Sequence, residues 1–280
     1  MSKTQELIKK LQDGVRDVFE SGRFQEYLDF LSSFRHYSFG NCLLLWQQMP
    51  SCSLVASYTE WNQKHHRQVK KGSKALKVLA PHYYKEKDAN GVEHDRLGFH
   101  CASCFDISQT YSIDDTPLPS LSQSLDTDVV GSADIIKTLI DASPYPIDVV
   151  DIEGSARGFF SPSDLRIVVQ RDMSPCDTIK TILHEQAHAW IFSEAEAEEY
   201  THAAHTRAEH EVSAESIAYI LCQRLGIDSG DYSFGYVSGW SADRTTPELM
   251  KSLDLIRKVS ERMWSLIEDK LVQDGLTSVA

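Results

Sequence analysis

The pair His184 and His188 constrains this 280-residue chain more than any other feature of its sequence. The two histidines are four residues apart, and on an α-helix this spacing places both imidazoles on one face, within reach of one cation. A helix is well signalled here, because Ser174 can cap it and Pro175 suits its first turn. Apolar residues follow at helical spacing: Ile179, Ile182, Leu183, Ala187 and Trp190. The sequence therefore predicts a metal site on a helix that borders a hydrophobic core.

Three glutamates complete this predicted site. Glu185 follows the first histidine and points beside the metal, where a general base acting on a water molecule must lie. A catalytic zinc needs a third protein ligand and one open position, and we assign Glu211, on the next expected helix, as that ligand. Glu215, one turn later, would accept a hydrogen bond from a ligand histidine. The rival ligands are interpreted as surface histidines: His202, His205 and His210.

This arrangement predicts zinc-dependent hydrolysis of peptide bonds by a metalloendopeptidase of the HExxH type. Glu185 would take a proton from water and pass it to the leaving amine. We expect the strand Leu165 to Val169 to pair with an extended peptide substrate. Three residues are conceivable as the group that stabilises the oxyanion: Tyr200, His205 and Tyr236.

A second candidate site lies in the first half of the chain. From Trp61 to Lys77 the sequence holds six lysines and arginines and no acid, and several aromatic residues lie just upstream. Cations beside aromatic rings suit single-stranded nucleic acid, because charge follows the phosphates and rings stack on bases. Composition alone favours the more ordinary interpretation, a solvated basic face beside aromatic residues of the core.

The charge distribution indicates two domains. Residues 1–125 carry 15 basic and 14 acidic side chains, whereas residues 126–280 carry 13 and 27. The Pro-, Ser- and Asp-rich stretch 114–120 suggests a linker, so we divide the chain into a domain 1–118, a linker 119–130 and a domain 131–280. No apolar run is long enough for a membrane span, and the six cysteines suit a reducing compartment. We therefore expect a cytoplasmic protein with no membrane partner.

The periodicity of apolar residues predicts an α+β fold. Helices are expected at 3–33, 37–48, 133–143, 175–194, 206–225 and 246–271. Strands are expected at 54–57, 75–80, 83–84, 97–107, 146–150 and 165–169, with a turn at 158–163.

Motifs in both halves together resemble the ArdC-type antirestriction proteins. In the first half these are Tyr37-Ser38-Phe39-Gly40-Asn41, Trp61, the run Arg67 to Gly72, Leu79-Ala80-Pro81, and the run Phe105 to Thr110. In the second half they are the run His184 to Ala189 and the run Glu211 to Ala218. The second of these is also similar to ImmA/IrrE-type metallopeptidases, in which the first glutamate is the third zinc ligand.

The resemblance implies a small mixed domain that binds single-stranded DNA, followed by a zincin-like metallopeptidase domain with a short sheet and zinc-holding helices. It also implies carriage on a mobile genetic element. The DNA-binding residues that it suggests are Tyr37, Ser38, Asn41, Trp61, Arg67, Lys70, Lys71 and Lys74. Two alternatives stay open: a protective DNA-binding protein whose zinc site is structural or catalytically silent, and a metal-stabilised interaction module that binds no DNA. The peptide substrate and the oligomeric state are not predicted.

Overall fold

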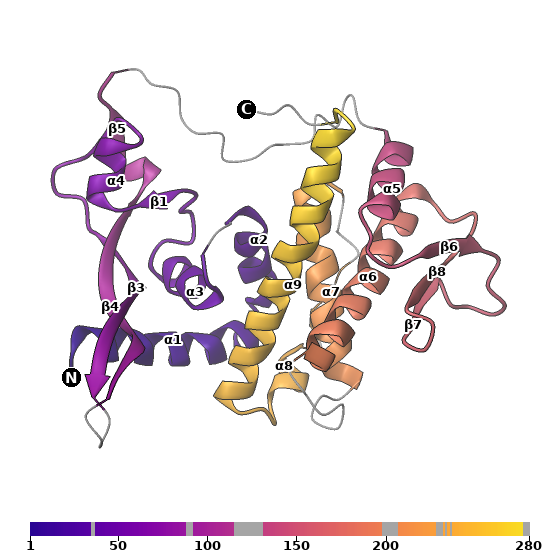
Figure 1. The fold of residues 1–280 in the computed structure, drawn as a ribbon, viewed down its shortest axis with the longest axis horizontal. Helices are drawn as coiled ribbons and strands as arrows, with labels where there is room; N and C mark the ends of the chain where they lie inside the picture. Colours follow the sequence, from indigo (N-terminus) through magenta and orange to yellow (C-terminus); the bar gives the residue numbers. More distant parts are fainter. Residues whose placement is uncertain are drawn as a thin grey trace. The chain divides into compact units, whose positions relative to one another are not determined.

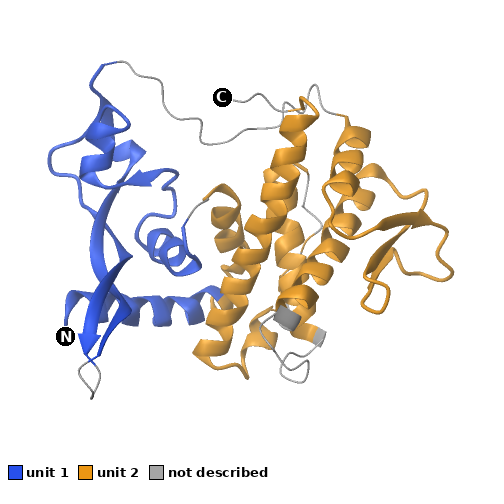
Figure 2. Cartoon of the chain, in the orientation of Figure 1, with its two compact units in different colours: residues 1–18, 36–121 blue, residues 19–35, 122–280 orange. Residues whose placement is uncertain are grey.

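The computed structural model describes residues 1–34, 37–87, 92–114, 131–197, 207–227, 232, 234–235 and 237–276. It combines helices with three small sheets, which confirms the predicted mixture of α and β structure (Figure 1). The chain divides into two compact units, residues 1–18 with 36–121 and residues 19–35 with 122–280 (Figure 2). The predicted linker 119–130 lies outside the described residues.

The first unit contains most of α1, two short helices and two small antiparallel sheets. Its elements are α1 (Lys3–Glu20), α3 (Phe39–Gln48), β1 (Val55–Ala56), α4 (Tyr58–Gln63), β2 (Arg67–Val69), β3 (Leu76–Lys87), β4 (Glu93–Asp106), a 3₁₀ turn (Ile107–Gln109) and β5 (Thr110–Ser112). One sheet has the order β1-β4-β3, and β2 pairs with β5 in the other. The strands predicted at 75–80, 83–84 and 97–107 are thus parts of one long hairpin.

The second unit contains helices and one mixed sheet. Its elements are α2 (Phe24–Ser33), α5 (Ser132–Asp141), β6 (Ile147–Val150), β7 (Gly158–Ser161), β8 (Arg166–Gln170), α6 (Pro175–Ala197), α7 (Arg207–Arg224), α8 (Val237–Ser241) and α9 (Thr246–Gln273). Helix α6 packs against α5, α7 and the sheet. It therefore has buried residues on most of its faces, as expected for a central helix.

The helix predicted over 3–33 is two helices. Gly22 has a φ of 74°, a left-handed conformation that glycine adopts without steric cost, and it separates α1 from α2. The apolar pattern continues on both sides of this break, since Leu11, Val15, Leu28 and Leu31 are all buried.

Helix α2 belongs to the second unit, although the sequence assigned residues 1–118 to one domain. It packs against α7, where the Tyr219 hydroxyl donates a hydrogen bond of 2.5 Å to Asp29 and accepts one of 3.2 Å from Gln25. The predicted boundary is therefore wrong for residues 19–35, because this segment joins the core that its apolar face contacts.

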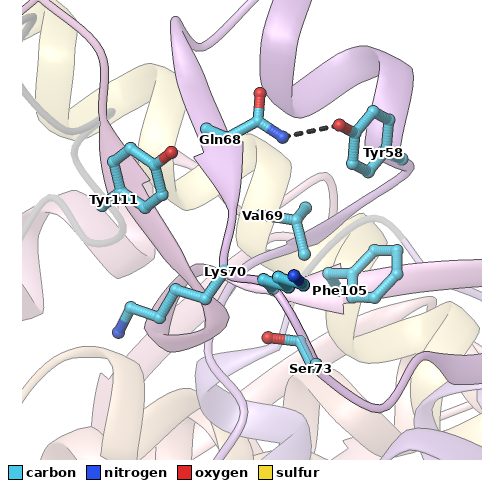
Figure 3. Close-up of a pocket in the computed structure, with 9 residues that line it drawn as sticks. Tyr58, Gln68, Val69, Lys70, Ser73, Phe105 and Tyr111 are labelled. Carbon is cyan, nitrogen blue, oxygen red and sulfur yellow. Dashed lines mark hydrogen bonds between the residues drawn. The ribbon is translucent and has the colours of Figure 1, made fainter.

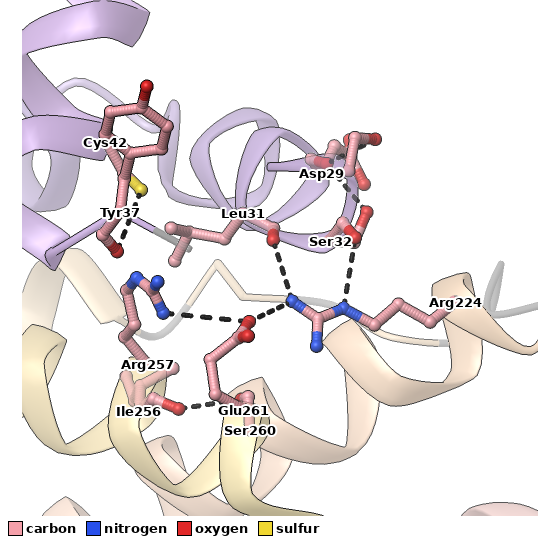
Figure 4. A network of polar contacts seen from close by, with 11 residues as sticks. Asp29, Leu31, Ser32, Tyr37, Cys42, Arg224, Ile256, Arg257, Ser260 and Glu261 are labelled. Carbon is pink, nitrogen blue, oxygen red and sulfur yellow. Dashed lines mark hydrogen bonds and ion pairs between the residues drawn. The ribbon is translucent and has the colours of Figure 1, made fainter. Parts of the chain in front are cut away.

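A polar network joins α2, α7 and α9 (Figure 4). The guanidinium of Arg224 donates to the backbone oxygens of Ser32, at 3.1 Å, and Leu31, at 3.3 Å. The same group forms an ion pair with Glu261, which also lies 3.6 Å from Arg257. Because the side chain of Arg224 is only 3% exposed, its charge depends on these partners.

The sheet of the second unit corrects two predictions. The segment read as a turn at 158–163 contains β7, which pairs antiparallel with β8. Strand β8 also pairs in parallel with β6, so it is the middle strand of the order β6-β8-β7. The expected pairing of residues 165–169 with a substrate is therefore wrong, because both edges of β8 are already occupied.

Among the helices that the structure describes, none is long and apolar enough to cross a membrane. All six cysteines have free thiols, as predicted.

Removing the buried cation tests the network around Arg224. Arg224→Ala should lower the free energy of unfolding by about 3 kcal/mol, because one partner of a buried ion pair is lost and two carbonyls lose donors. Lys137→Ala removes an exposed ion pair with Asp141 in the same unit and should leave the free energy of unfolding nearly unchanged. Equal effects of the two substitutions, measured by urea unfolding, would contradict this role.

Candidate functional site

Helix α6 positions the two predicted histidine ligands. Its start is fixed as the sequence predicts, because the Ser174 hydroxyl accepts a hydrogen bond of 3.1 Å from the Asp177 amide. The predicted apolar residues are buried: Ile179, Ile182, Leu183, Ala187 and Trp190. Gln186 also anchors the helix, since its side chain donates a 3.0 Å bond to the carbonyl of Leu139 in α5. The Nε2 atoms of His184 and His188 lie 3.0 Å apart.

Helix α7 brings Glu211 to these histidines. Its Oε2 atom lies 3.6 Å from Nε2 of His184 and 3.7 Å from Nε2 of His188. Ala214 and Ala218 are fully buried on the same helix, and such small side chains permit close packing against α6. Pairing with the two imidazoles holds the pKa of the Glu211 carboxyl well below its usual range.

These three side chains fit a divalent cation. Around a tetrahedral zinc with ligands at about 2.0–2.1 Å, neighbouring donor atoms lie about 3.4 Å apart. The three observed separations of 3.0, 3.6 and 3.7 Å are close to this value. Two imidazoles and one carboxylate suit zinc better than a cation that prefers oxygen ligands alone. The structure thus brings together all three predicted ligands, His184, His188 and Glu211.

Glu185 is buried beside this group of ligands, with only 8% of its surface exposed. Burial raises the pKa of its carboxyl, while the nearby charges of His184 and His188 act in the opposite direction. A carboxyl group whose pKa is raised toward neutrality can exchange a proton with a reacting molecule.

Strand β7 holds Glu185 from the side opposite the helix. The backbone of Phe160 lies near the Glu185 carboxylate and acts to lower its pKa, against the larger effect of burial. Gly158 permits this approach, because a Cβ atom there would lie 2.6 Å from Cγ2 of Thr181 and 3.2 Å from Cγ of Glu185. Neither Gly158 nor Phe160 was among the predicted site residues, because their segment was predicted to be a turn.

The remaining predicted residues of this site are Glu215 and the rival ligands. Burial acts to lower the pKa of His184, whereas the negative charge of Glu215 acts to raise it, so Glu215 lies near that histidine. His210 is half-buried on α7 beside Glu211. Four residues lie outside the described part of the chain: Tyr200, His202, His205 and Tyr236.

In the first unit, four of the predicted DNA-binding residues form part of the framework. Trp61 is fully buried and its indole donates a 2.7 Å bond to the Phe105 carbonyl, so its ring cannot stack on a base, contrary to the prediction. The Tyr37 hydroxyl donates to Val55 at 2.7 Å, and Ser38 caps α3. The Asn41 amide bonds both backbone groups of Leu79, at 2.8 and 2.9 Å.

The other four predicted residues lie on β2 and the loop that follows it. Arg67 is half-buried and donates to Thr110 at 2.7 Å, whereas Lys70, Lys71 and Lys74 are exposed. We refer to Lys70–Ser73 as the basic turn. Its Ser73 amide donates to the Lys70 carbonyl at 3.2 Å, and Gly72 has the positive φ, 85°, that such a turn requires at this position.

An open cavity of about 530 Å³ adjoins the basic turn (Figure 3). Its lining includes three aromatic residues that the predicted DNA-binding set left out, Tyr58, Phe105 and Tyr111, together with Gln68. Tyr111 pairs with Gln68 across the two-stranded sheet β2-β5. Strands of three residues are too short to be recognised from the periodicity of apolar residues.

Comparison with known proteins finds one matching family model and a relative that aligns with most of the chain. Residues 2–102 match the model of the N-terminal domain of anti-restriction factor ArdC. An uncharacterized protein of Bacillus anthracis is 24% identical over 96% of the chain, and the chain spans about half, 52%, of the length of that relative.

Over 92% of its length the chain is similar in fold to ArdC. The metal-free crystal structure of ArdC from plasmid R388 is 18% identical, with a TM-score of 0.62 over 92% of this chain and 98% of that one. The Mn(II)-bound structure of the same protein gives 16% identity and a TM-score of 0.59, over 91% of this chain and 97% of that one.

Metal affinity across single variants tests the ligand set. Glu211→Ala should reduce zinc affinity more than Glu215→Ala, for which about 10–100-fold is expected of a group that orients a ligand. His210→Ala is the matched control and should retain about one zinc per chain, because adjacent residues project about 100° apart around the helix. Affinity is measured by competition with a chelator. If His210 proved essential and Glu211 dispensable, the centre would use three histidines.

Proposed function

We propose that the chain is an ArdC-like antirestriction protein of a mobile genetic element, which binds single-stranded DNA through its first unit. The observation that carries this proposal is the match of residues 2–102 to the model of the N-terminal domain of anti-restriction factor ArdC. In the first unit the basic turn presents exposed cations beside two half-exposed aromatic rings, Tyr58 and Tyr111. This combination suits phosphates and unstacked bases.

We further propose that the second unit is a zincin-like metallopeptidase with zinc as its cofactor. The observation that favours it is Glu185, which is buried beside the three proposed ligands and lies close to Gly158 of β7. A bound zinc would act as a Lewis acid toward the scissile carbonyl and the attacking water. His184, His188 and Glu211 would hold it.

In this proposal the residues of the chain orient the substrate and move the proton. Glu185 accepts a proton from the attacking water and returns it to the leaving nitrogen, and close packing against Gly158 of β7 restricts its side chain. Strand β7 is the edge of the order β6-β8-β7, and it lies against α6. An extended peptide could add to this edge, where its backbone would pass beside Glu185.

The DNA proposal predicts a strong dependence on salt. Each phosphate contact on a single strand contributes about 0.7 to the slope of log affinity against log salt. Replacing both Lys70 and Lys71 by alanine should therefore weaken binding of single-stranded oligonucleotides and reduce that slope by about 1.4. Fluorescence anisotropy at several salt concentrations measures both quantities.

The matched control replaces Lys9 and Lys10, two exposed lysines of α1 in the same unit. The control removes the same net charge and should change the slope much less. Equal slopes for the two double variants would mean that net charge, and not the basic turn, determines binding.

The peptidase proposal predicts a separation of metal binding from turnover. Glu185→Gln should retain about one zinc per chain and lose proteolysis of a broad panel of proteins, because only the proton acceptor is removed. Metal content is measured by atomic absorption and cleavage by mass spectrometry.

Loss of zinc in Glu185→Gln would show that Glu185 is a ligand. If the zinc-loaded wild type cleaved nothing in the panel, with and without single-stranded DNA, the second unit would be a structural or silent metal centre, and the DNA proposal would stand alone.

A further inference from the structure

The cavity beside the basic turn has the chemistry of a binding site for a flat aromatic group. Val69 and Phe105 contribute apolar surface to its lining, and Tyr58 packs edge-on against Phe105, with ring centroids 6.5 Å apart. Tyr58 and Tyr111 are each 52% exposed, so both rings leave a large apolar surface in contact with water. Figure 3 shows the two tyrosines on either side of Gln68 and Val69. A flat ligand in this cavity would therefore meet aromatic side chains from two directions.

Gln68 of β2 lies between the two tyrosines. Its side chain donates a 2.6 Å hydrogen bond to the Tyr58 hydroxyl (Figure 3), and its Cα is paired with that of Tyr111 in the neighbouring strand. The bond orients the Tyr58 side chain before binding, which reduces the entropy that a ligand must remove.

The cavity also has a cationic side. Lys70 and Lys71 line it together with Gly72 and Ser73, and its described lining residues include no acid. The basic turn is anchored at both ends of Lys70, since its amide donates to the Gln109 carbonyl and its ammonium to the Ser108 carbonyl, each at 2.8 Å. An anion attached to the flat group would therefore meet fixed positive charge.

We propose that this cavity receives one unpaired base of single-stranded DNA, which stacks against Tyr58 and Tyr111 while Lys70 and Lys71 contact the adjacent phosphates. The inference rests on the DNA-binding function proposed above and assigns it a base-binding site. Stacking on aromatic rings and charge along the backbone are the two elements of such recognition. A base within a duplex is covered by its neighbours, so this site selects single strands.

Two oligonucleotides of equal charge test the proposal on the full chain. One is an oligothymidylate of about 12 nucleotides, within the range of known site sizes, and the other has the same phosphates but abasic sugars. Tyr58→Ala and Tyr111→Ala should each weaken binding of the oligothymidylate by about 5- to 150-fold, the range found when a stacking ring is removed. Binding of the abasic strand should not change, because its phosphates still meet both lysines.

Two controls distinguish stacking from a loss of fold. Tyr58→Phe keeps the ring and should retain most of the affinity for the oligothymidylate. Tyr83→Ala removes a tyrosine that is 78% exposed on the β3-β4 hairpin, outside the cavity, and should leave both affinities unchanged. Melting temperatures of the alanine variants, compared with the wild type, report on folding.

A photo-cross-linking experiment locates the base directly. An oligonucleotide with 5-bromouracil should form its main cross-link to a peptide that contains Tyr58 or Tyr111. If the wild type binds the oligothymidylate but Tyr58→Ala and Tyr111→Ala do not alter its affinity, or weaken both strands equally, the base-binding site is wrong and the DNA-binding function stands. If the wild type binds neither strand, the DNA-binding function itself fails.

Discussion

The packing of α7 against α6 is the constraint on which the candidate metal centre depends. The Glu211 side chain is 46% exposed and shares its helix face with Ala214 and Ala218, both fully buried. The two imidazoles of α6 lie 3.6 and 3.7 Å from its carboxylate. Glu209, buried two residues earlier, is in turn bonded by Ser252 of α9 at 3.2 Å. The start of α7 is thereby fixed between two helices, and the ligand set requires no rearrangement of the backbone to form.

Strand β7 adds a second constraint, because it connects the sheet to the group proposed to move protons. Gly158 lies so close to Thr181 and Glu185 that a side chain at this position would displace one of them. Glu185 is thus confined between its own helix and an edge strand. A structural zinc site is closed by four ligands and activates no water, so it has no need of a proton acceptor beside it. This confinement is the physical reason to separate the role of Glu185 from that of the ligands.

The placement of the two histidines of the candidate metal centre could be predicted because its information is local. The spacing of His184 and His188 and the capping of α6 by Ser174 lie within fifteen residues, where helical geometry dictates which side chains share a face. The cavity in the first unit could not be predicted from the sequence. It depends on the pairing of β2 with β5, two strands of three residues each that lie more than forty residues apart in the chain. Trp61 illustrates the same limit: an aromatic residue beside a basic run suggests stacking, but burial is decided by distant residues, here the Phe105 carbonyl.

The proposed DNA site in the first unit would have two separate contributions to affinity. Electrostatic attraction would depend on Lys70 and Lys71, whereas stacking would depend on tyrosines whose contribution salt affects little. Lys70 is held through a chain of bonds: its ammonium donates to the Ser108 carbonyl, and the carboxylate of Asp106 accepts from the amides of Ser108 and Ser53 at 2.9 and 2.8 Å. Asp106 is buried and part of β4. The basic turn is thus attached to the sheet of its own unit, which would reduce the conformational entropy that a bound strand must remove.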